Sequence, residues 1–235
     1  MPQFSSGQTL LIDADDTLWE NNIYFERAIT AFISYLNHHT YSSEEVRRAL
    51  NQAERESILA RGYGLQSFTH SLTVCFERLT TAPISQEKHQ RILSFAQSIA
   101  DQEIELLPGV AELLPKLAAR HRLILMTKGN QAEQADKLTR SGLAQHFSAV
   151  EIVAEKNPAA YREVVNRNHC PASSTWMIGN SPKSDINPAL AAGLNAVFIV
   201  HKDTWVLEHA EIDHAPEGQS LIEVDCFAKL EDHFG

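Results

Sequence analysis

The chain has 235 residues, 43% of them hydrophobic, and a formal net charge of -10 at pH 7. This length and composition are typical of one large globular domain, or of a core domain with an insertion, and they allow a substantial buried core. The negative charge argues against a general binder of nucleic acid or of anionic membranes, because both require concentrated Lys and Arg. No stretch of about 18 consecutive apolar residues occurs, so no membrane-spanning helix is predicted.

The cysteines and the first residues indicate where the protein works. Cys75, Cys170 and Cys226 are scattered and show no CxxC spacing, so neither a disulfide framework nor a zinc site is predicted. The eleven histidines, His38-His39 among them, show no metal-ligand spacing either. The opening segment lacks the basic and apolar regions of a secretion signal. We therefore expect a cytoplasmic protein with no nucleic-acid or membrane partner.

Five short apolar segments predict β-strands that are buried on both faces. They are residues 9–15, 122–127, 149–153, 175–180 and 196–200. The later strands alternate with amphipathic helical patterns, which implies a parallel sheet with helices on both faces. The predicted fold class is therefore α/β, with a Rossmann-like, doubly wound parallel sheet as the core. At the end of the chain, residues 220–234 alternate charged and apolar side chains and predict a final helix packed on this core.

The segment between the first two strands shows no convincing strand but four amphipathic stripes, which predict a helical insertion. The stripes are Phe25, Ile29, Phe32, Ile33 and Leu36; Val46, Leu50 and Ala53; Phe68, Leu72, Cys75, Phe76 and Leu79; and Ile92, Leu93, Ala96 and Ile99. We expect a core domain of residues 1–18 and 106–235 and an inserted helical-bundle domain of residues 19–105. This second domain is expected to hang over the ligand crevice of the core.

Three carboxylates crowd the end of the first predicted strand. Asp13, Asp15 and Asp16 follow the apolar run directly, at the edge of an open α/β sheet where ligands usually bind. Alternation along an extended segment puts Asp13 and Asp15 on the same side, where a divalent cation such as Mg²⁺ would relieve their repulsion. The alternative is that the carboxylates only cap the next helix.

The second predicted strand ends in Thr127-Lys128-Gly129, just before a helix. A hydroxyl followed by a glycine turn offers backbone N–H groups and a helix dipole to an anion. The alternative is a plain strand-to-helix turn in which Asn130 caps the helix.

The remaining strand ends carry a lysine and a second group of oxygens. Lys156 stands just before Asn157-Pro158, which predict an N-cap and the first position of a helix. The alternative for Lys156 is an ordinary solvated surface residue. The fourth strand ends in Gly179-Asn180 with Asp185 five positions later, so a second oxygen cluster can face the first. There the alternative is a turn with Ser184 as helix cap.

Taken in order, these strand ends resemble the motifs of the haloacid dehalogenase superfamily, in its phosphatase form with a helical C1 cap. The superfamily shows Asp-x-Asp-x-Thr, a strand ending in Ser or Thr, a Lys, and Gly-Asp followed by Asp. The matching pieces here are Asp13-Ala14-Asp15-Asp16-Thr17, then Thr127, then Lys156, and finally Gly179-Asn180 with Asp185. The resemblance covers nearly the whole chain, and the helical insertion is similar to the superfamily's small cap.

The resemblance implies a Mg²⁺-dependent phosphatase that hydrolyses small phosphorylated metabolites. Asp13 would attack phosphorus and form an aspartyl-phosphate, and Asp15 would act as general acid and then as general base. Mg²⁺ would lie between Asp13, the backbone carbonyl of Asp15, and the fourth motif with Asn180 and Asp185. The phosphate oxygens would be bound by Thr127, Lys128, Gly129 and Lys156.

One residue departs from the family pattern and keeps other functions open. Asn180 stands where the family usually has an Asp that binds the metal, and a neutral amide oxygen should hold Mg²⁺ less tightly. The metal-free branch of the family, the 2-haloacid dehalogenases, is one alternative, although the acid Asp15 argues against it. A phosphomutase of the same superfamily is a second, and a non-catalytic binding or regulatory protein with a weakened metal site is a third. In the cap, Arg61-Gly62-Tyr63-Gly64 is either a loop that reaches toward the substrate or a plain turn.

Overall fold

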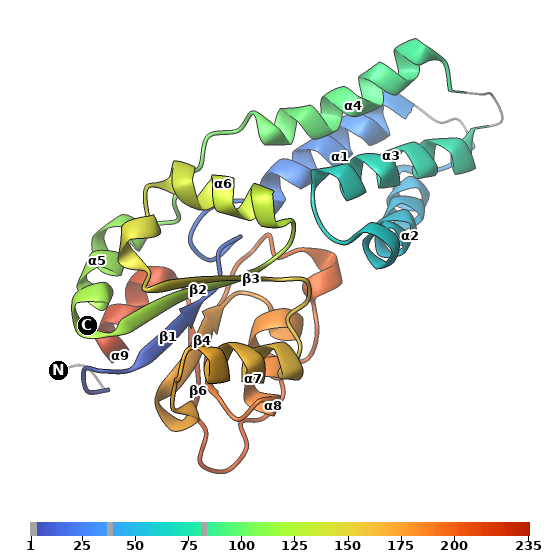
Figure 1. Cartoon of the computed structure of the whole chain (residues 1–235). Helices are drawn as coiled ribbons and strands as arrows, with labels where there is room; N and C mark the ends of the chain where they lie inside the picture. The colour runs from blue at the N-terminus through green and yellow to red at the C-terminus, as the bar shows by residue number, and fades with distance from the viewer. Residues whose placement is uncertain (1–3, 37–39, 81–83) are drawn as a thin grey trace. The chain divides into compact units, whose positions relative to one another are not determined.

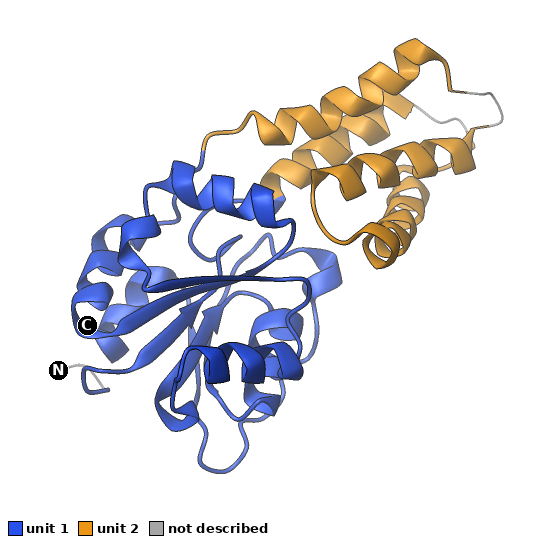
Figure 2. Cartoon of the chain, in the orientation of Figure 1, with its two compact units in different colours: residues 1–22, 104–235 blue, residues 23–103 orange. Residues whose placement is uncertain are grey.

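The computed structural model describes residues 4–36, 40–80 and 84–235, and His38-His39 therefore lie outside the described residues (Figure 1). The chain divides into two compact units (Figure 2). One unit consists of Met1–Asn22 and Ile104–Gly235, and the other is the inserted segment Ile23–Glu103. Among the described helices, none is both long enough and apolar enough to cross a membrane.

The first unit contains a six-stranded sheet in the order β3-β2-β1-β4-β5-β6, in which every neighbouring pair is parallel. The strands are β1 (Thr9–Ile12), β2 (Arg122–Lys128), β3 (Ala149–Val153), β4 (Thr175–Gly179), β5 (Asn195–Ile199) and β6 (Leu221–Val224). The chain winds outward from β1 in both directions, through β2 and β3 on one side and through β4, β5 and β6 on the other. This is the switch point of a doubly wound sheet, and the carboxyl ends of β1, β2 and β4 meet there.

Helices cover both faces of this sheet, as the alternation of strands and helices predicts. They are α5 (Val110–Arg120), α6 (Gln131–Ser141), α7 (Pro158–Arg167), α8 (Asn187–Ala191) and α9 (Glu231–Phe234). Successive strand residues alternate between the two faces. Leu10 and Ile12 pack with Leu114 of α5, whereas Leu11 packs with Tyr161 of α7. The α/β fold class with a Rossmann-like, doubly wound core is therefore confirmed.

The last part of the chain differs from the prediction of one continuous helix over residues 220–234. Leu221–Val224 forms strand β6 instead, paired with β5, and only the final residues are helical, as a 3₁₀ turn (Phe227–Leu230) followed by α9. A free sheet edge offers backbone hydrogen bonds to a short apolar segment, and this tertiary contact outweighs the local alternation pattern.

The prediction that every strand is buried on both faces is also wrong at the other sheet edge. Strand β3 is only half-buried, and its Val150 is 43% exposed, because β3 has a neighbour on one side alone. The central strand β1 is fully buried along its whole length and ends at Ile12, so Asp13 already lies beyond it.

The second unit is built from α1 (Asn22–Leu36), α2 (Ser43–Arg61), α3 (Leu65–Leu79) and α4 (Gln86–Ala100). Ser42 and Glu45 form a reciprocal capping box at the start of α2, and Ser85 caps α4. All four stripes contribute to one buried cluster, through Phe32, Leu50, Leu72 and Ile92 among others. Between α2 and α3, Gly62 and Gly64 take positive φ angles of 77° and 123°, which favour glycine in this short turn.

Candidate active site

Asp13 lies just beyond the end of β1 and is nearly buried, with 7% of its surface exposed. Its backbone N–H still pairs with the carbonyl of Ile178 in β4, at 2.9 Å, which fixes the direction of its side chain. One carboxylate oxygen accepts a hydrogen bond from Thr17 Oγ1 at 3.1 Å, and the other accepts one from Lys156 Nζ. The strand end therefore presents a fixed carboxylate to the edge of the sheet.

Lys156 is a buried residue, not the solvated lysine of the alternative interpretation. Asn157 caps α7 by accepting from two backbone N–H groups, and Pro158 is the first helical residue, as predicted. This cap turns Lys156 inward, where Nζ donates to Asp13 and, at 2.7 Å, to Asp185 Oδ1. Burial lowers the pKa of Lys156, but the two carboxylates outweigh that effect and raise it above the ordinary lysine value, so Lys156 stays charged.

Two buried carboxylates share this single ammonium. Burial, together with repulsion from Asp185, raises the pKa of Asp13 to about 7 despite the attraction of Lys156. The site consequently holds more negative charge than its own cation compensates. A second positive charge would be stabilised here.

Asp185 owes its position to the turn after β4. Its Oδ2 accepts from the backbone N–H of Ser181 at 2.9 Å, and Gly179 leaves the space for the carboxylate, because a Cβ at Gly179 would lie 2.2 Å from that same oxygen. The structure places the cap at Ser181, whose side chain accepts from the N–H of Ser184. The alternative interpretation, with Ser184 as the helix cap, is therefore wrong, because a π-helical segment (Pro182–Ile186) already starts at Pro182 and its cap lies three residues before Ser184.

Asn180 points its amide oxygen toward Thr17, the residue that also contacts Asp13. The amide nitrogen donates to Thr204 Oγ1 at 3.1 Å, which orients the side chain, while Oδ1 accepts from Thr17 Oγ1 at 3.3 Å. Thr17 thus contacts both Asp13 and Asn180, and a hard oxygen from the fourth motif faces the first motif.

Asp15 has a separate environment, built by helix α6. Lys137 Nζ lies 2.9 Å from Oδ1 and 3.1 Å from Oδ2 of Asp15, and Gln134 Nε2 donates to Oδ2 at 2.8 Å. Trp19 Nε1 donates to Oδ1 at 2.8 Å. Burial alone would raise the pKa of Asp15, but Lys137 and these donors bring it below the ordinary aspartate value. Asp15 is therefore held as a carboxylate.

The residues at the end of β2 and in the turn after it divide between two hydrogen-bond networks. Thr127 Oγ1 faces Gln134 Oε1 at 3.5 Å, so Gln134 lies between Thr127 and Asp15. Gly129 adopts φ 140°, and a Cβ there would crowd Gln134 Nε2 at 3.2 Å. Asn130 caps α6 through the N–H groups of residues 132 and 133, as its alternative interpretation predicts.

Lys128 extends toward the turn that carries Asp185. Its Nζ donates to Ser184 Oγ and to Glu208 Oε1, both at 2.7 Å. Glu208 also accepts from Ser181 and Ser184. Burial raises the pKa of Glu208, but Lys128 and the two serines outweigh this and lower it, so Glu208 stays ionised.

Asp16 does not contribute to the cluster around Lys156. It takes φ 61°, an uncommon conformation for a residue with a side chain, and accepts from the backbone N–H groups of Asn21 and Asn22 at the start of α1. Burial raises the pKa of Asp16 to about 7. The helix-cap interpretation of the opening carboxylates thus applies to Asp16, while Asp13 and Asp15 have other partners.

The structure also shows residues that the sequence motifs did not single out. Gln134 and Lys137 occupy neighbouring turns of one face of α6, three positions apart, directly after the second strand end. This spacing on one helix face could have identified Gln134 and Lys137 from the sequence. No sequence pattern pointed to Glu208, because it is 80 residues from its partner Lys128.

This combination of a doubly wound sheet with carboxylates and a lysine at the strand ends agrees with the family that the motifs resemble. The chain belongs to the haloacid dehalogenase-like hydrolase family, whose model matches residues 10–199. The glyceraldehyde 3-phosphate phosphatase of Methanothermobacter thermautotrophicus is 25% identical over 237 residues, which cover 96% of this chain and 98% of that relative.

Solved structures support the same assignment. A haloacid dehalogenase-like hydrolase from Xanthomonas campestris is 28% identical, with a TM-score of 0.79 over 96% of this chain and 93% of its own. The L-2-haloacid dehalogenase from Xanthobacter autotrophicus shares the fold at 15% identity, with a TM-score of 0.64 over 95% and 96% of the two chains.

Proposed function

We propose that this hydrolase is a Mg²⁺-dependent phosphatase of small phosphorylated metabolites that works through an aspartyl-phosphate on Asp13. The observation that carries the proposal is the pair of differently held carboxylates at the end of β1. Asp13 contacts Lys156 and Thr17, whereas Asp15 contacts Lys137 and Gln134. Phosphoryl transfer needs one carboxylate as nucleophile and a second for proton transfer.

Asp13 is the proposed nucleophile. Its backbone is fixed by β4 and its carboxylate by Thr17 and Lys156, so it is oriented before the substrate arrives. Lys156 keeps a positive charge beside it, favours the ionised form, and offers a donor to a phosphate oxygen.

The oxygen donors around Asp13 fit a Mg²⁺ ion. Asp13 and Asp185 are carboxylates with only one lysine between them, and Thr204 orients Asn180 so that its amide oxygen faces the same group. Hard oxygen ligands with excess negative charge are the donor set that Mg²⁺ prefers. We propose that Asp13, Asn180, Asp185 and the backbone carbonyl of Asp15 hold it. When bound, the ion would offset charge on the phosphoryl oxygens and help to hold the attack in line.

Asp15 is the proposed general acid and base. A protonated Asp15 would give its proton to the leaving alcohol, and the resulting carboxylate would take a proton from the water that hydrolyses the aspartyl-phosphate. The contacts with Lys137 and Gln134 favour the carboxylate, the form needed for the second step.

We propose that Thr127, Lys128, Gly129 and Lys156 bind the phosphate group. Thr127 and Gly129 lie at the end of β2, and the backbone N–H groups of this turn precede the positive end of α6. The inserted unit of residues 23–103 is the proposed cap that selects among substrates. The unpaired cysteines agree with a proposed cytoplasmic location.

The dehalogenase alternative makes a different demand on Asp15. A halide leaving group needs no proton, so a dehalogenase gains nothing from an acid at this position. The presence of Asp15, a residue able to take up and release a proton, therefore favours the phosphatase. The named phosphatase among the relatives supports the same choice.

The test is a turnover screen of the full chain with Mg²⁺ against an aryl phosphate, sugar phosphates, nucleotides and phosphorylated acids, with 2-chloropropionate as the dehalogenase substrate. We expect phosphate release, which Asp13→Asn abolishes while its circular dichroism spectrum stays unchanged. Hydrolysis that survives in folded Asp13→Asn, or chloride release in place of phosphate release, would refute the proposal. A phosphomutase would return the phosphate to another hydroxyl of the same sugar, which product analysis detects.

A further inference from the structure

Unsatisfied buried polar atoms gather in one place in the first unit. Within the described residues, five buried side-chain atoms lack a hydrogen-bond partner, and three of them belong to Glu20, His201 and Asp203. Buried polar atoms are almost always hydrogen-bonded in folded proteins, so such a concentration calls for a bound water or ion. The other two, in Glu54 and Ser67, lie in the inserted unit.

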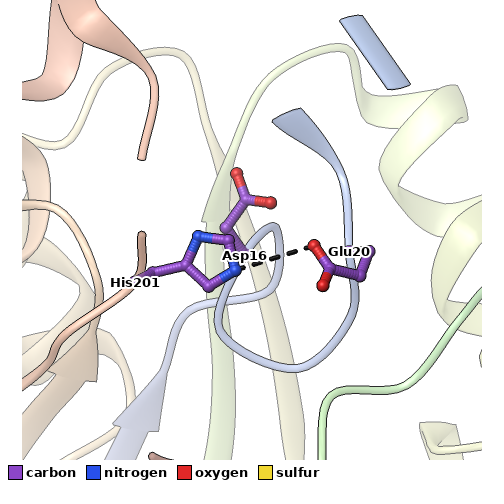
Figure 3. Close-up of side chains that lie close together, drawn as sticks. All are labelled: Asp16, Glu20 and His201. Atoms are coloured by element: carbon purple, nitrogen blue, oxygen red, sulfur yellow. Dashed lines mark ion pairs between the residues drawn. The ribbon is translucent and has the colours of Figure 1, made fainter. Parts of the chain in front are cut away.

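The side chains of Asp16, Glu20 and His201 lie close together, with His201 directed at Glu20 (Figure 3). One potential ligand atom from each of the three residues lies within 4.8 Å of the other two. The imidazole of His201 has 9% of its surface exposed, and its Nε2 lies 3.6 Å from Glu20 Oε2, too far for a hydrogen bond. An almost buried imidazole thus points at two carboxylates without a hydrogen bond of its own.

The cluster also gathers acidic groups. Asp16 and Glu20 contribute two carboxyl groups, and Asp203 adds a third near His201. A bound cation would favour the ionised form of these groups. Burial lowers the pKa of His201 despite the nearby Glu20 and Asp203. Lys202 approaches Asp203 at 3.7 Å, but its side chain is 78% exposed and remains in water.

We propose that Asp16, Glu20 and His201 form a second divalent-metal site, separate from the Mg²⁺ site at Asp13 and Asp185. One imidazole nitrogen with two carboxylate oxygens is a donor set for a first-row transition ion, with Zn²⁺ the best match. Zinc–ligand distances are about 2.0–2.2 Å, so the ligand atoms of a tetrahedral zinc ion lie about 3.4 Å apart. His201 Nε2 and Glu20 Oε2, which are 3.6 Å apart, are already close to this spacing. The other separations lie within 4.8 Å and would have to shorten by at most about 1.4 Å.

The ion would join two loops that follow different strands. Asp16 and Glu20 lie after β1, and His201 lies after β5. A hydrogen bond from Asn22 Nδ2 to the carbonyl of Asp203, at 2.7 Å, already links these loops. Thr204 in the second loop orients Asn180, so the ion would stabilise the support of the proposed Mg²⁺ site without binding substrate.

Calorimetric titration of the full chain with Zn²⁺, in buffer with excess Mg²⁺, tests this site without any activity assay. We expect one Zn²⁺ per chain, and an affinity at least about tenfold lower in His201→Gln and in Glu20→Gln. The matched control is His214→Gln, which removes an exposed imidazole from the same region and should bind as the wild type does. Thermal melting checks that each variant folds. If His201→Gln does not fold, the Zn²⁺ affinity of Glu20→Gln decides the test.

The outcome for Asp13→Asn separates the two metal sites and the two proposals. Zn²⁺ binding that persists in this variant supports the second site, even if no phosphatase activity is found. Three results overturn it: no Zn²⁺ binding in the presence of Mg²⁺, equal affinity in wild type, Glu20→Gln and His201→Gln, or loss of Zn²⁺ binding in Asp13→Asn.

Discussion

Replacing Lys137 with Met tests the proposed role of Asp15 most sharply. Methionine keeps much of the length of the side chain but removes the ammonium that lies 2.9 and 3.1 Å from the two oxygens of Asp15. Gln134 and Trp19 still donate to Asp15, so its position is largely retained. The variant therefore removes mainly the charge that favours the carboxylate form.

The size of the effect follows from the exposure of the pair. Two unit charges about 4 Å apart near a protein surface attract by about 4 kcal/mol, before the cost of desolvation is subtracted. Both side chains are 23% exposed, and a hydrogen bond to a charged group contributes about 1.5–3 kcal/mol net. We take the lower end, which corresponds to a factor of about ten in the protonation equilibrium of Asp15.

This loss should fall on the second chemical step. Without Lys137 the pKa of Asp15 rises, so the acid limb of the pH profile for hydrolysis of the aspartyl-phosphate moves to higher pH, and on that limb hydrolysis slows about tenfold. Dinitrophenyl phosphate has a leaving group that needs no proton, so the first step is unaffected. At a pH on this acid limb, a rapid-quench assay should show a burst of dinitrophenol, a slower steady state, and more trapped phosphoenzyme than in the wild type.

The control is Lys116→Met, which breaks an ion pair with Glu231 whose side chains are both more than half exposed. It should behave as the wild type does, since exposed pairs contribute little. An equal fraction of phosphoenzyme in Lys137→Met and wild type on the acid limb, or a change in KM alone, would refute the reasoning.

Three further variants probe the rest of the account. Gly179→Ala places a Cβ 2.2 Å from the Asp185 carboxylate and so displaces this proposed metal ligand. The Mg²⁺ concentration for half-maximal activity should rise at least about tenfold, and an unchanged Mg²⁺ dependence would contradict the metal assignment. Glu208→Gln leaves Lys128 without its main partner and should cost about 3 kcal/mol in urea unfolding at neutral pH. The folded-state pKa of Glu208 lies below its ordinary value of 4.5, so the wild type loses this advantage as the pH falls through that range. The free energies of unfolding of wild type and Glu208→Gln should therefore converge in acid. A difference between them that does not depend on pH would contradict this reasoning. Phe234→Ala empties a fully buried aromatic site at the end of the chain and should cost about 3–5 kcal/mol in the same assay, whereas a cost below about 1 kcal/mol would show that the final helix does not pack on the core.

The strands and the family could be predicted because their signals are local. Apolar runs ending in small or polar residues mark β1 to β5, and the Asn157-Pro158 cap fixes where Lys156 lies. The prediction of a helix was wrong for strand β6, because its four residues carry no distinguishing pattern and their strand conformation depends on pairing with β5.

The partners of the candidate site residues could not be predicted, since they come from distant segments. Lys137 is 122 positions from Asp15, and Glu208 is 80 from Lys128. Only the fold brings them together. The family resemblance implies separate roles for Asp13 and Asp15, but it does not reveal the partners of the three carboxylates after β1. In the structure, Asp13 contacts Lys156, Asp15 contacts Lys137, and Asp16 contacts the start of α1.

The central claim is that Asp13 carries the phosphoryl group. The direct measurement is to quench the enzyme in acid during turnover of an aryl phosphate, reduce the acyl phosphate with borohydride, and map the modified residue by peptide mass spectrometry. Our account predicts homoserine at position 13 and at no other aspartate. Turnover without any modified residue, or modification at Asp15 or Asp185, would contradict it.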